Sequence, residues 1–280
     1  MAENERYPAR LPDSLGHTLV IMKYELLNYF RTRRFYILLG IGVTISLLLT
    51  VLVGYYRPRG LLSSPLAFYA SWWGLSINFV VILAGIFFGG DAISGEFQNK
   101  TGYFTVGHPI RRISIYIGKW LAALIAAVVV FVLYTLIAIA NGIYYFGPNL
   151  PGQLAVAIGL GLLYLLAVLA FTFLFSSLFK SSAMSILVTA ILLLFGFSII
   201  DELLATLAGV EPWFILTYGG SIVGNSLMNP YPAHMVHAGP EAGNLIIYSA
   251  SVPEGVVILL SYFVVCAVVG LYLFERKEFT

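Results

Sequence analysis

Six long apolar stretches dominate this chain, and none of them contains an Asp, Glu, Lys, Arg or His residue. A helix needs about 20 apolar residues to cross the hydrocarbon core of a bilayer, where the backbone has to satisfy its own hydrogen bonds. The stretches are of about this length and cover residues 35–55, 69–90, 120–146, 154–179, 183–200 and 255–274. The sequence therefore predicts an all-α polytopic membrane protein with six transmembrane helices.

The composition agrees with this class and leaves little chain for anything else. Hydrophobic residues make up 60% of the chain and charged residues 10%, whereas soluble domains have about 45–50% and 25%. The polar connections are too short for a second folded domain, so we expect one domain over residues 1–280. We expect the third helix to span 113–146, starting before its uncharged part. The first stretch follows a polar, Arg-rich tail that does not resemble a signal peptide, and we expect it to remain as a span.

The distribution of basic residues predicts the orientation. Thirteen of the fifteen Lys and Arg residues lie in the N-terminal tail, the second and fourth connections, or the C-terminal tail. The other two, Arg57 and Arg59, lie in the first connection. Because basic residues concentrate on the cytoplasmic side, both termini are predicted to be cytoplasmic, in a protein of the cell membrane.

The tail from 13 to 34 has the pattern of an amphipathic helix. Its apolar residues recur at steps of three and four, at Leu15, Leu19, Met22, Leu26 and Phe30. We expect an interfacial helix that lies on the inner leaflet with its basic end near anionic headgroups. The alternative is that this face binds a partner.

The connection 201–254 is the longest segment expected outside the membrane. It contains an apolar stretch, 213–223, that is too short to cross the bilayer and is interrupted by Gly219 and Gly220. We expect a re-entrant or surface-lying segment here, since irregular backbone is tolerated where protein or water covers it.

The sequence lacks the motifs of the common catalytic sites. The nearest fragment to a Walker A loop is Gly118-Lys119-Trp120, but Ile113 stands where the first glycine is required. Neither a His-Glu-x-x-His zinc helix nor a Gly-x-Ser-x-Gly elbow is present. We therefore expect a chain that is not an enzyme by itself, has no catalytic residues and binds no cofactor.

A few polar or small residues stand out against the apolar background. Asn78 and Asn141 could line a polar passage or simply form hydrogen bonds between helices. Gly85 and Gly89 form a small-residue pair, for which packing within the chain is the plainer interpretation.

Two histidines in the last connection, His234 and His237, could form an outward-facing metal site with Glu241. Since a proline-rich loop offers no helical face to pair them, two solvated histidines are the plainer interpretation, and we expect no metal site.

The connection 91–112 carries the strongest functional signal. Ile93 and Phe97 are four residues apart and Phe104 follows, which predicts a short helix with one apolar face before the breaker at Pro109. Such a helix could dock into a groove of a partner protein or lie on the membrane as a connector.

This connection also has a recognisable order of residue types. An acidic residue ends a span. It is followed in order by Ile-Ser-x-Glu, by Thr-Gly, by Pro with a nearby Arg, and by Gly-Lys at the start of the next span. The residues at these positions are Asp91, Ile93, Ser94, Glu96, Thr101, Gly102, Pro109, Arg112, Gly118 and Lys119. In this order, and in its basic tail at Arg276 and Lys277, the chain resembles the permease subunits of ABC-2 type transporters. It departs from their pattern at Arg111 and at the uncharged pair Gln98-Asn99.

The resemblance implies one half of an exporter. Two six-span permeases, identical or related, would pair with two separate cytoplasmic ATPase subunits that hold the ATP and Mg²⁺. The segment 91–112 would be the coupling helix seated on the ATPase, and the tail helix would touch it through Glu25. The implied coupling residues are Asp91, Ile93, Ser94, Glu96, Phe97, Thr101, Gly102 and Glu25.

Two other functions remain open from the residues alone. A secondary transporter or channel would usually carry ionisable residues at membrane depth, which these stretches lack. A membrane-embedded enzyme would have to use His234, His237 and Glu241. The bilayer is an expected partner and nucleic acid is not.

Overall fold

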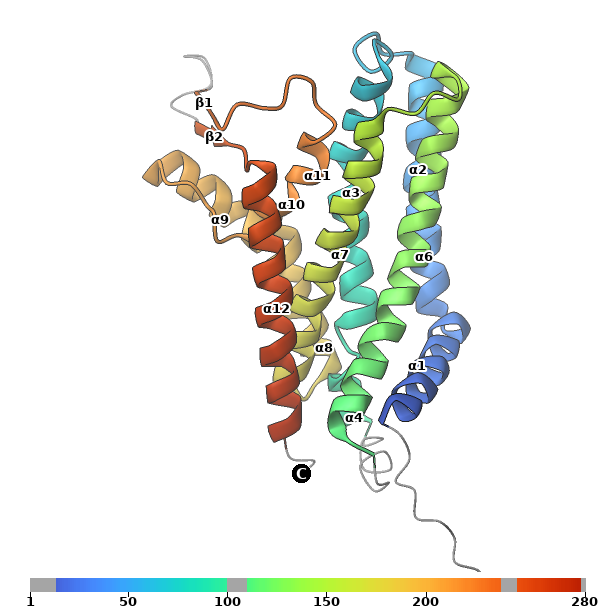
Figure 1. Cartoon of the computed structure of the whole chain (residues 1–280), viewed down its shortest axis with the longest axis vertical. Coiled ribbons are helices and arrows are strands. Elements are labelled where there is room, and N and C mark those ends of the chain that lie inside the picture. The colour runs from blue at the N-terminus through green and yellow to red at the C-terminus, as the bar shows by residue number, and fades with distance from the viewer. Residues whose placement is uncertain (1–13, 100–109, 238–245, 278–280) are drawn as a thin grey trace, which may run out of the picture.

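A computed structural model describes residues 14–99, 110–237 and 246–277 of the chain (Figure 1). Six helices in the described part are long and apolar enough to cross a membrane. The first four are α2 (Arg33–Tyr56), α3 (Pro65–Gly89), α6 (Arg112–Phe146) and α7 (Gly152–Leu178). A fifth helix starts with α8 (Ser182–Ile191), and the sixth is α12 (Val252–Arg276). The prediction of a six-span, all-α membrane protein is confirmed.

The centre of the bundle is formed by α3, α6 and α7. Side chains of these helices such as Trp73, Phe131 and Tyr164 are almost completely buried, and the rings of Trp73 and Phe131 lie 6.0 Å apart. The approach of α3 to α7 depends on small residues, because a methyl group at Gly89 would overlap the side chain of Thr172. Packing within the chain is therefore the role of this glycine.

The peripheral helices expose apolar faces instead. Large side chains of α2 and α12 such as Leu48, Val51, Val257 and Val268 are more than half exposed. Since apolar surface on this scale is stable against lipid or another protein but not against water, these faces mark the outer wall of the bundle.

The fifth helix is longer than the sequence predicted. After α8 it continues without a break through a π-helical turn η1 (Leu192–Gly196), α9 (Phe197–Leu203) and a second π-helical turn η2 (Leu204–Ala208). The predicted end at residue 200 is wrong, because Asp201 and Glu202 end the apolar stretch but not the helix. The helix ends where Gly209 adopts a left-handed conformation. Figure 1 shows α9 leaning away from α12.

The connection between η2 and α12 folds over one end of the bundle, which we call the loop end. Its apolar stretch forms α10 (Leu216–Gly220) and α11 (Ile222–Asn225), which are buried between α12, α7 and α3 (Figure 1). Two short strands follow, β1 (Met235–His237) and β2 (Ile246–Tyr248), and pair in antiparallel fashion. This small hairpin was not predicted.

The opposite end, which we call the basic end, carries α1 (Ser14–Arg31), α4 (Ser94–Gln98) and the end of α12 (Figure 1). The predicted tail helix 13–34 is two elements, because Thr32 is extended and separates α1 from α2. Its apolar face is also divided. Leu26 and Phe30 pack against the bundle, whereas Leu15 and Leu19 are exposed.

Candidate functional site

A buried lysine at the basic end connects three separate elements. Lys119 lies in the second turn of α6, and its side chain is only 8% exposed. Its Nζ lies 2.8 Å from Glu96 Oε1 in α4 and also forms an ion pair with Glu25 in α1. We call these three residues the charged node.

The charged node depends on the glycine that precedes the lysine. A Cβ atom at Gly118 would lie 2.9 Å from both the carbonyl oxygen of Thr18 and Cγ2 of Ile21. Only a residue without a side chain lets α1 approach α6 so closely. Glu25 lies one helical turn beyond Ile21, which brings its carboxylate to Lys119.

A second ion pair holds α2 against the end of α3. Arg34 pairs with Asp91, the acidic residue that follows the second span. Next to it, the hydroxyl of Tyr29 donates a hydrogen bond of 2.8 Å to the carbonyl oxygen of Phe88. Burial, reinforced by the charges of Glu25 and Asp91, raises the pKa of Tyr29 well above its ordinary value, so the phenol remains a donor.

The short helix α4 is fastened to α7 and α8. The backbone N–H groups of Ile93 and Ser94 donate to Ser176 Oγ at 2.9 and 3.0 Å. At the other end of α4, Gln98 Oε1 accepts a hydrogen bond of 2.7 Å from the backbone N–H of Ser182, the first residue of α8. The element that the sequence singled out is thus bound to two membrane-spanning helices.

This arrangement corrects one expectation about α4. The resemblance implied that Ile93 and Ser94 contact an ATPase, but both are completely buried in this chain. The hydroxyl of Ser94 lies 3.3 Å from Ser176 Oγ of α7, while Gln98 and Asn99 are exposed and Phe97 is half-buried. Thr101, Gly102 and Phe104 lie outside the described residues.

The C-terminal residues close the same region from the other side. Lys277 Nζ donates to the carbonyl oxygens of Ser177 and Phe179, which end α7, at 2.9 and 2.7 Å. It also lies 4.3 Å from the centre of the Phe97 ring. Burial, together with the charge of Lys180, lowers the pKa of Lys277 to about 8.

The sequence indicated Lys277 only as part of a basic tail. It did not indicate Ser176 or Tyr29, because a single hydroxyl in or near an apolar span is too common to stand out.

A groove of about 450 Å³ opens beside the charged node. Its lining combines acidic and basic side chains with two exposed amides, Asn28 of α1 and Asn99 beyond α4. Among the described residues its lining contains no catalytic set of nucleophile, base and oxyanion donors.

The two candidate pathway residues lie in different surroundings. Asn141 donates a hydrogen bond of 2.9 Å to the carbonyl oxygen of Ile137 in its own helix and lines a groove of about 320 Å³ with Thr50 and Tyr145. Asn78 does not line this groove. Its Oδ1 is buried and accepts no hydrogen bond from the described residues.

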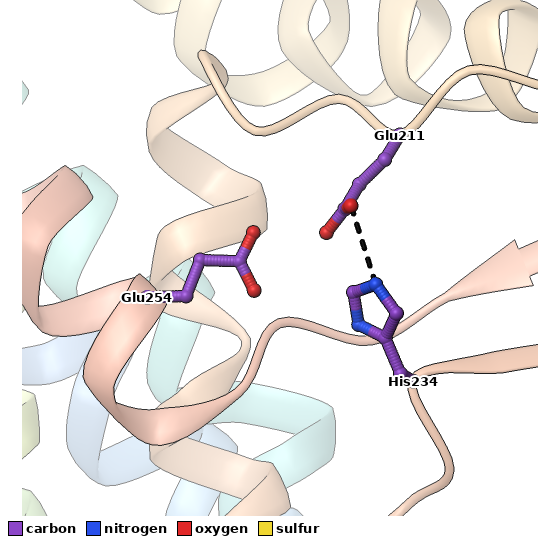
Figure 2. Close-up of side chains that lie close together, drawn as sticks. All are labelled: Glu211, His234 and Glu254. Carbon is purple, nitrogen blue, oxygen red and sulfur yellow. Dashed lines mark ion pairs between the residues drawn. The ribbon is translucent and has the colours of Figure 1, made fainter.

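One histidine of the loop end lies beside partners that the sequence did not indicate. His237 lies on β1, and Glu241 lies outside the described residues. His234 instead faces Glu211 and Glu254, as Figure 2 shows. Both glutamates are distant in sequence from the histidine, and no local spacing indicated them.

Comparison with known proteins gave one family match. The family model described as ABC-2 family transporter protein matches residues 19–279. The matched region contains the charged node, α4, all six long helices and the loop end. No curated protein matches the chain.

Proposed function

Because the chain belongs to the ABC-2 family of transporter proteins, we propose that it is the permease subunit of an ATP-driven exporter. In this proposal, separate ATPase subunits dock on the basic end. The family supplies the membrane component of ABC transporters, which is not itself catalytic. Each cycle of ATP binding and hydrolysis in the partner then drives a change of shape in the permease.

The basic end faces the cytoplasm in this proposal. Its exposed cations include Arg31, Arg33, Arg111 and Arg276, whereas the loop end has Arg57 and Arg59. The positive-inside rule supports this orientation in the cell membrane. Both termini and the groove are then on the side where ATP is available.

The observation that carries the proposal is the charged node. Lys119 connects α1 and α4, which are the two elements nearest a cytoplasmic partner, to the long helix α6. Breaking a buried ion pair by removing one partner costs about 3–5 kcal/mol, so the three elements are expected to move together. Through Ser176, α4 is likewise joined to α7.

Force applied by the ATPase to α4 would therefore reach two helices of the bundle centre at once. For this to drive transport, the ATPase has to bind one conformation of the permease more tightly than the other. The ATP-bound and ATP-free partners supply that difference. The permease needs only to transmit it.

The translocation pathway is proposed to lie between two permease copies, identical or related. The centre of a single chain is filled by large side chains such as Trp73, Phe131 and Tyr164. The exposed apolar faces of the peripheral helices offer surface for a second copy. The family resemblance supports export as the direction.

Two exposed amides of the groove allow a direct test. Asn28→Trp and Asn99→Trp would fill the groove, and neither amide side chain forms a hydrogen bond with another described residue. Asn149→Trp makes the same change at an exposed position of the loop end and is the matched control. The tagged full-length permease would be purified from its native membranes, and ATPase subunits would be identified by mass spectrometry and by ATP hydrolysis.

We expect ATPase subunits to accompany the wild-type permease and the Asn149→Trp control. Each groove variant should bind the ATPase about tenfold more weakly than the wild type, or weaker still. A tenfold loss corresponds to about 1.4 kcal/mol of binding free energy. A wild-type permease that moves its substrate in vesicles without ATP or any ATPase subunit would contradict the proposal.

A further inference from the structure

Three side chains with metal-binding atoms meet at the loop end, far from the charged node. Glu211 lies just after η2, His234 just before β1, and Glu254 in the first turn of α12. One ligand atom from each lies within 4.8 Å of the other two. Figure 2 shows the two carboxylates and the imidazole facing a common space.

The histidine is oriented in the way that metal-binding histidines are. Its Nδ1 lies 3.1 Å from the carbonyl oxygen of Ser249, and its Nε2 lies 3.2 Å from Glu211 Oε2. A carbonyl oxygen can only accept, so Nδ1 carries a proton. Nε2 faces the carboxylates and is the ring atom placed to bind a metal ion. A backbone carbonyl in this position commonly sets the tautomer of a metal ligand.

Each carboxylate accepts a hydrogen bond that holds it in place. The hydroxyl of Tyr218 donates to Glu211 Oε1 at 2.5 Å, and the backbone N–H of Ser251 donates to Glu254 Oε2 at 3.2 Å. Tyr218 is itself buried. All three potential ligands are thus oriented by the protein, although they come from three separate segments of the chain.

Distance and charge favour a cation at this point. Zinc binds nitrogen and oxygen ligands at about 2.0–2.2 Å, so neighbouring ligands of a tetrahedral ion are about 3.4 Å apart. The observed 3.2 Å between His234 Nε2 and Glu211 Oε2 is close to this value. Two carboxylates lie near each other here, and a divalent ion would offset the repulsion between them.

The ligand types narrow the choice of ion. Calcium and magnesium prefer oxygen ligands alone, whereas one imidazole with two carboxylates suits zinc and similar transition metals. The side chain of His234 is 56% exposed, so the site is open to solvent and can take a water molecule as a further ligand.

We propose that Glu211, His234 and Glu254 bind one divalent transition-metal ion, with Zn²⁺ the best suited. The ion would hold the connection between the fifth helix and the hairpin against the first turn of α12. It would act as a structural clamp on the outer face of the permease, independently of the ATPase at the other end.

The test uses the full-length permease in detergent after removal of metals with a chelator. Titration with ZnCl₂ alone, followed by equilibrium dialysis and metal analysis, should give one Zn²⁺ per chain. His234→Ala, Glu211→Gln and Glu254→Gln should each abolish this binding. Tyr218→Phe, which leaves the ligands but frees one carboxylate, should weaken it by about 10–100-fold.

Two matched controls lie in the same region. His237→Ala removes the neighbouring histidine of β1, and Glu202→Gln neutralises an exposed carboxylate of α9. Both should bind one Zn²⁺ with unchanged affinity, and Zn²⁺ should raise the unfolding temperature of the wild type and of both controls, but not of His234→Ala.

The proposal is overturned if the metal-free wild type binds no Zn²⁺ stoichiometrically. It is also overturned if His234→Ala binds Zn²⁺ like the wild type, or if His237→Ala loses it. Unfolding temperatures measured without metal separate a lost ligand from a damaged fold. Tyr218→Phe is the second route if a glutamine variant fails to fold.

Discussion

Replacing Lys119 by Met tests the charged node most directly. The change keeps most of the length and apolar character of the side chain but removes its charge. Glu25 and Glu96 would then face each other without a cation, in a place where their side chains are only 22% and 16% exposed. A buried charge left without its partner is costly, so the variant should be clearly less stable.

The magnitude follows from the burial of the three groups. Removing one partner of a buried pair costs about 3–5 kcal/mol, and the residual exposure of both glutamates places this case near the lower end. We expect Lys119→Met to lower the free energy of unfolding by about 3 kcal/mol. One of the glutamates should also take up a proton on mutation, because two adjacent carboxylates cannot both stay charged at low cost.

A neutral variant separates charge from packing. Combining Lys119→Met with Glu25→Gln and Glu96→Gln leaves no uncompensated charge, and replacing a whole buried ion group is often close to neutral. The triple variant should therefore recover most of the lost stability. If the charged node also transmits force, the triple variant should bind the ATPase subunits normally but transport less substrate per ATP hydrolysed than the wild type.

The measurement is reversible unfolding by SDS in mixed micelles, followed by circular dichroism, for the wild type, the single variant and the triple variant. Exposed surface ion pairs contribute only about 0–1 kcal/mol to stability. If the free energy of unfolding of Lys119→Met lay within about 0.5 kcal/mol of the wild type, the reasoning would be refuted. It would mean that the lysine is hydrated or that its two partners are not held together.

Three further predictions concern the same end of the molecule. Gly118→Ala should push Thr18 and Ile21 of α1 away from α6 and cost about 1–3 kcal/mol in SDS unfolding, whereas Gly159→Ala in α7, which meets no atom within 4 Å, should be neutral or stabilising; equal effects would contradict the close approach. Ser176→Ala should leave two buried N–H groups unsatisfied and cost about 1–3 kcal/mol, and a smaller loss would show that water replaces the hydroxyl. The pKa of Lys277 in the folded protein is about 8, below the ordinary 10.5, so the unfolded chain binds more protons than the folded protein between pH 8 and pH 10.5. The free energy of unfolding should therefore rise with pH in this range for the wild type, and Lys277→Met should lack this rise. Identical pH profiles of the unfolding midpoint for the two proteins would refute the shift.

The sequence was most informative where local pattern decides structure. Apolar stretches of membrane-spanning length predicted the six helices, since length and hydrophobicity alone determine whether a segment can cross. One error occurred at a helix end. At Asp201 the apolar stretch stops, but the backbone hydrogen bonds continue through a second π-helical turn to Ala208, and no residue-by-residue hydropathy shows this.

The sequence also indicated which connection matters but not how it is held. The order from Asp91 to Lys119 was sufficient to suggest the family, and the family match agrees. The resemblance implied that Ile93 contacts an ATPase, but Ile93 is completely buried within this chain, because an amphipathic pattern shows that one face is buried but not against what. Its backbone N–H donates to Ser176 of the protein's own helix α7.

Membrane insertion, the number of spans and the segment of interest were thus determined by the sequence alone, because they depend on the chemistry of neighbouring residues. The meeting of Lys119 with Glu25, 94 residues away, and of His234 with Glu211 and Glu254 was decided only by the tertiary structure. Each partner is an ordinary charged residue in its own segment. The packing of α1 on α6 brings Glu25 to Lys119. The packing of the connection before α12 on the first turn of α12 brings His234 to the two glutamates.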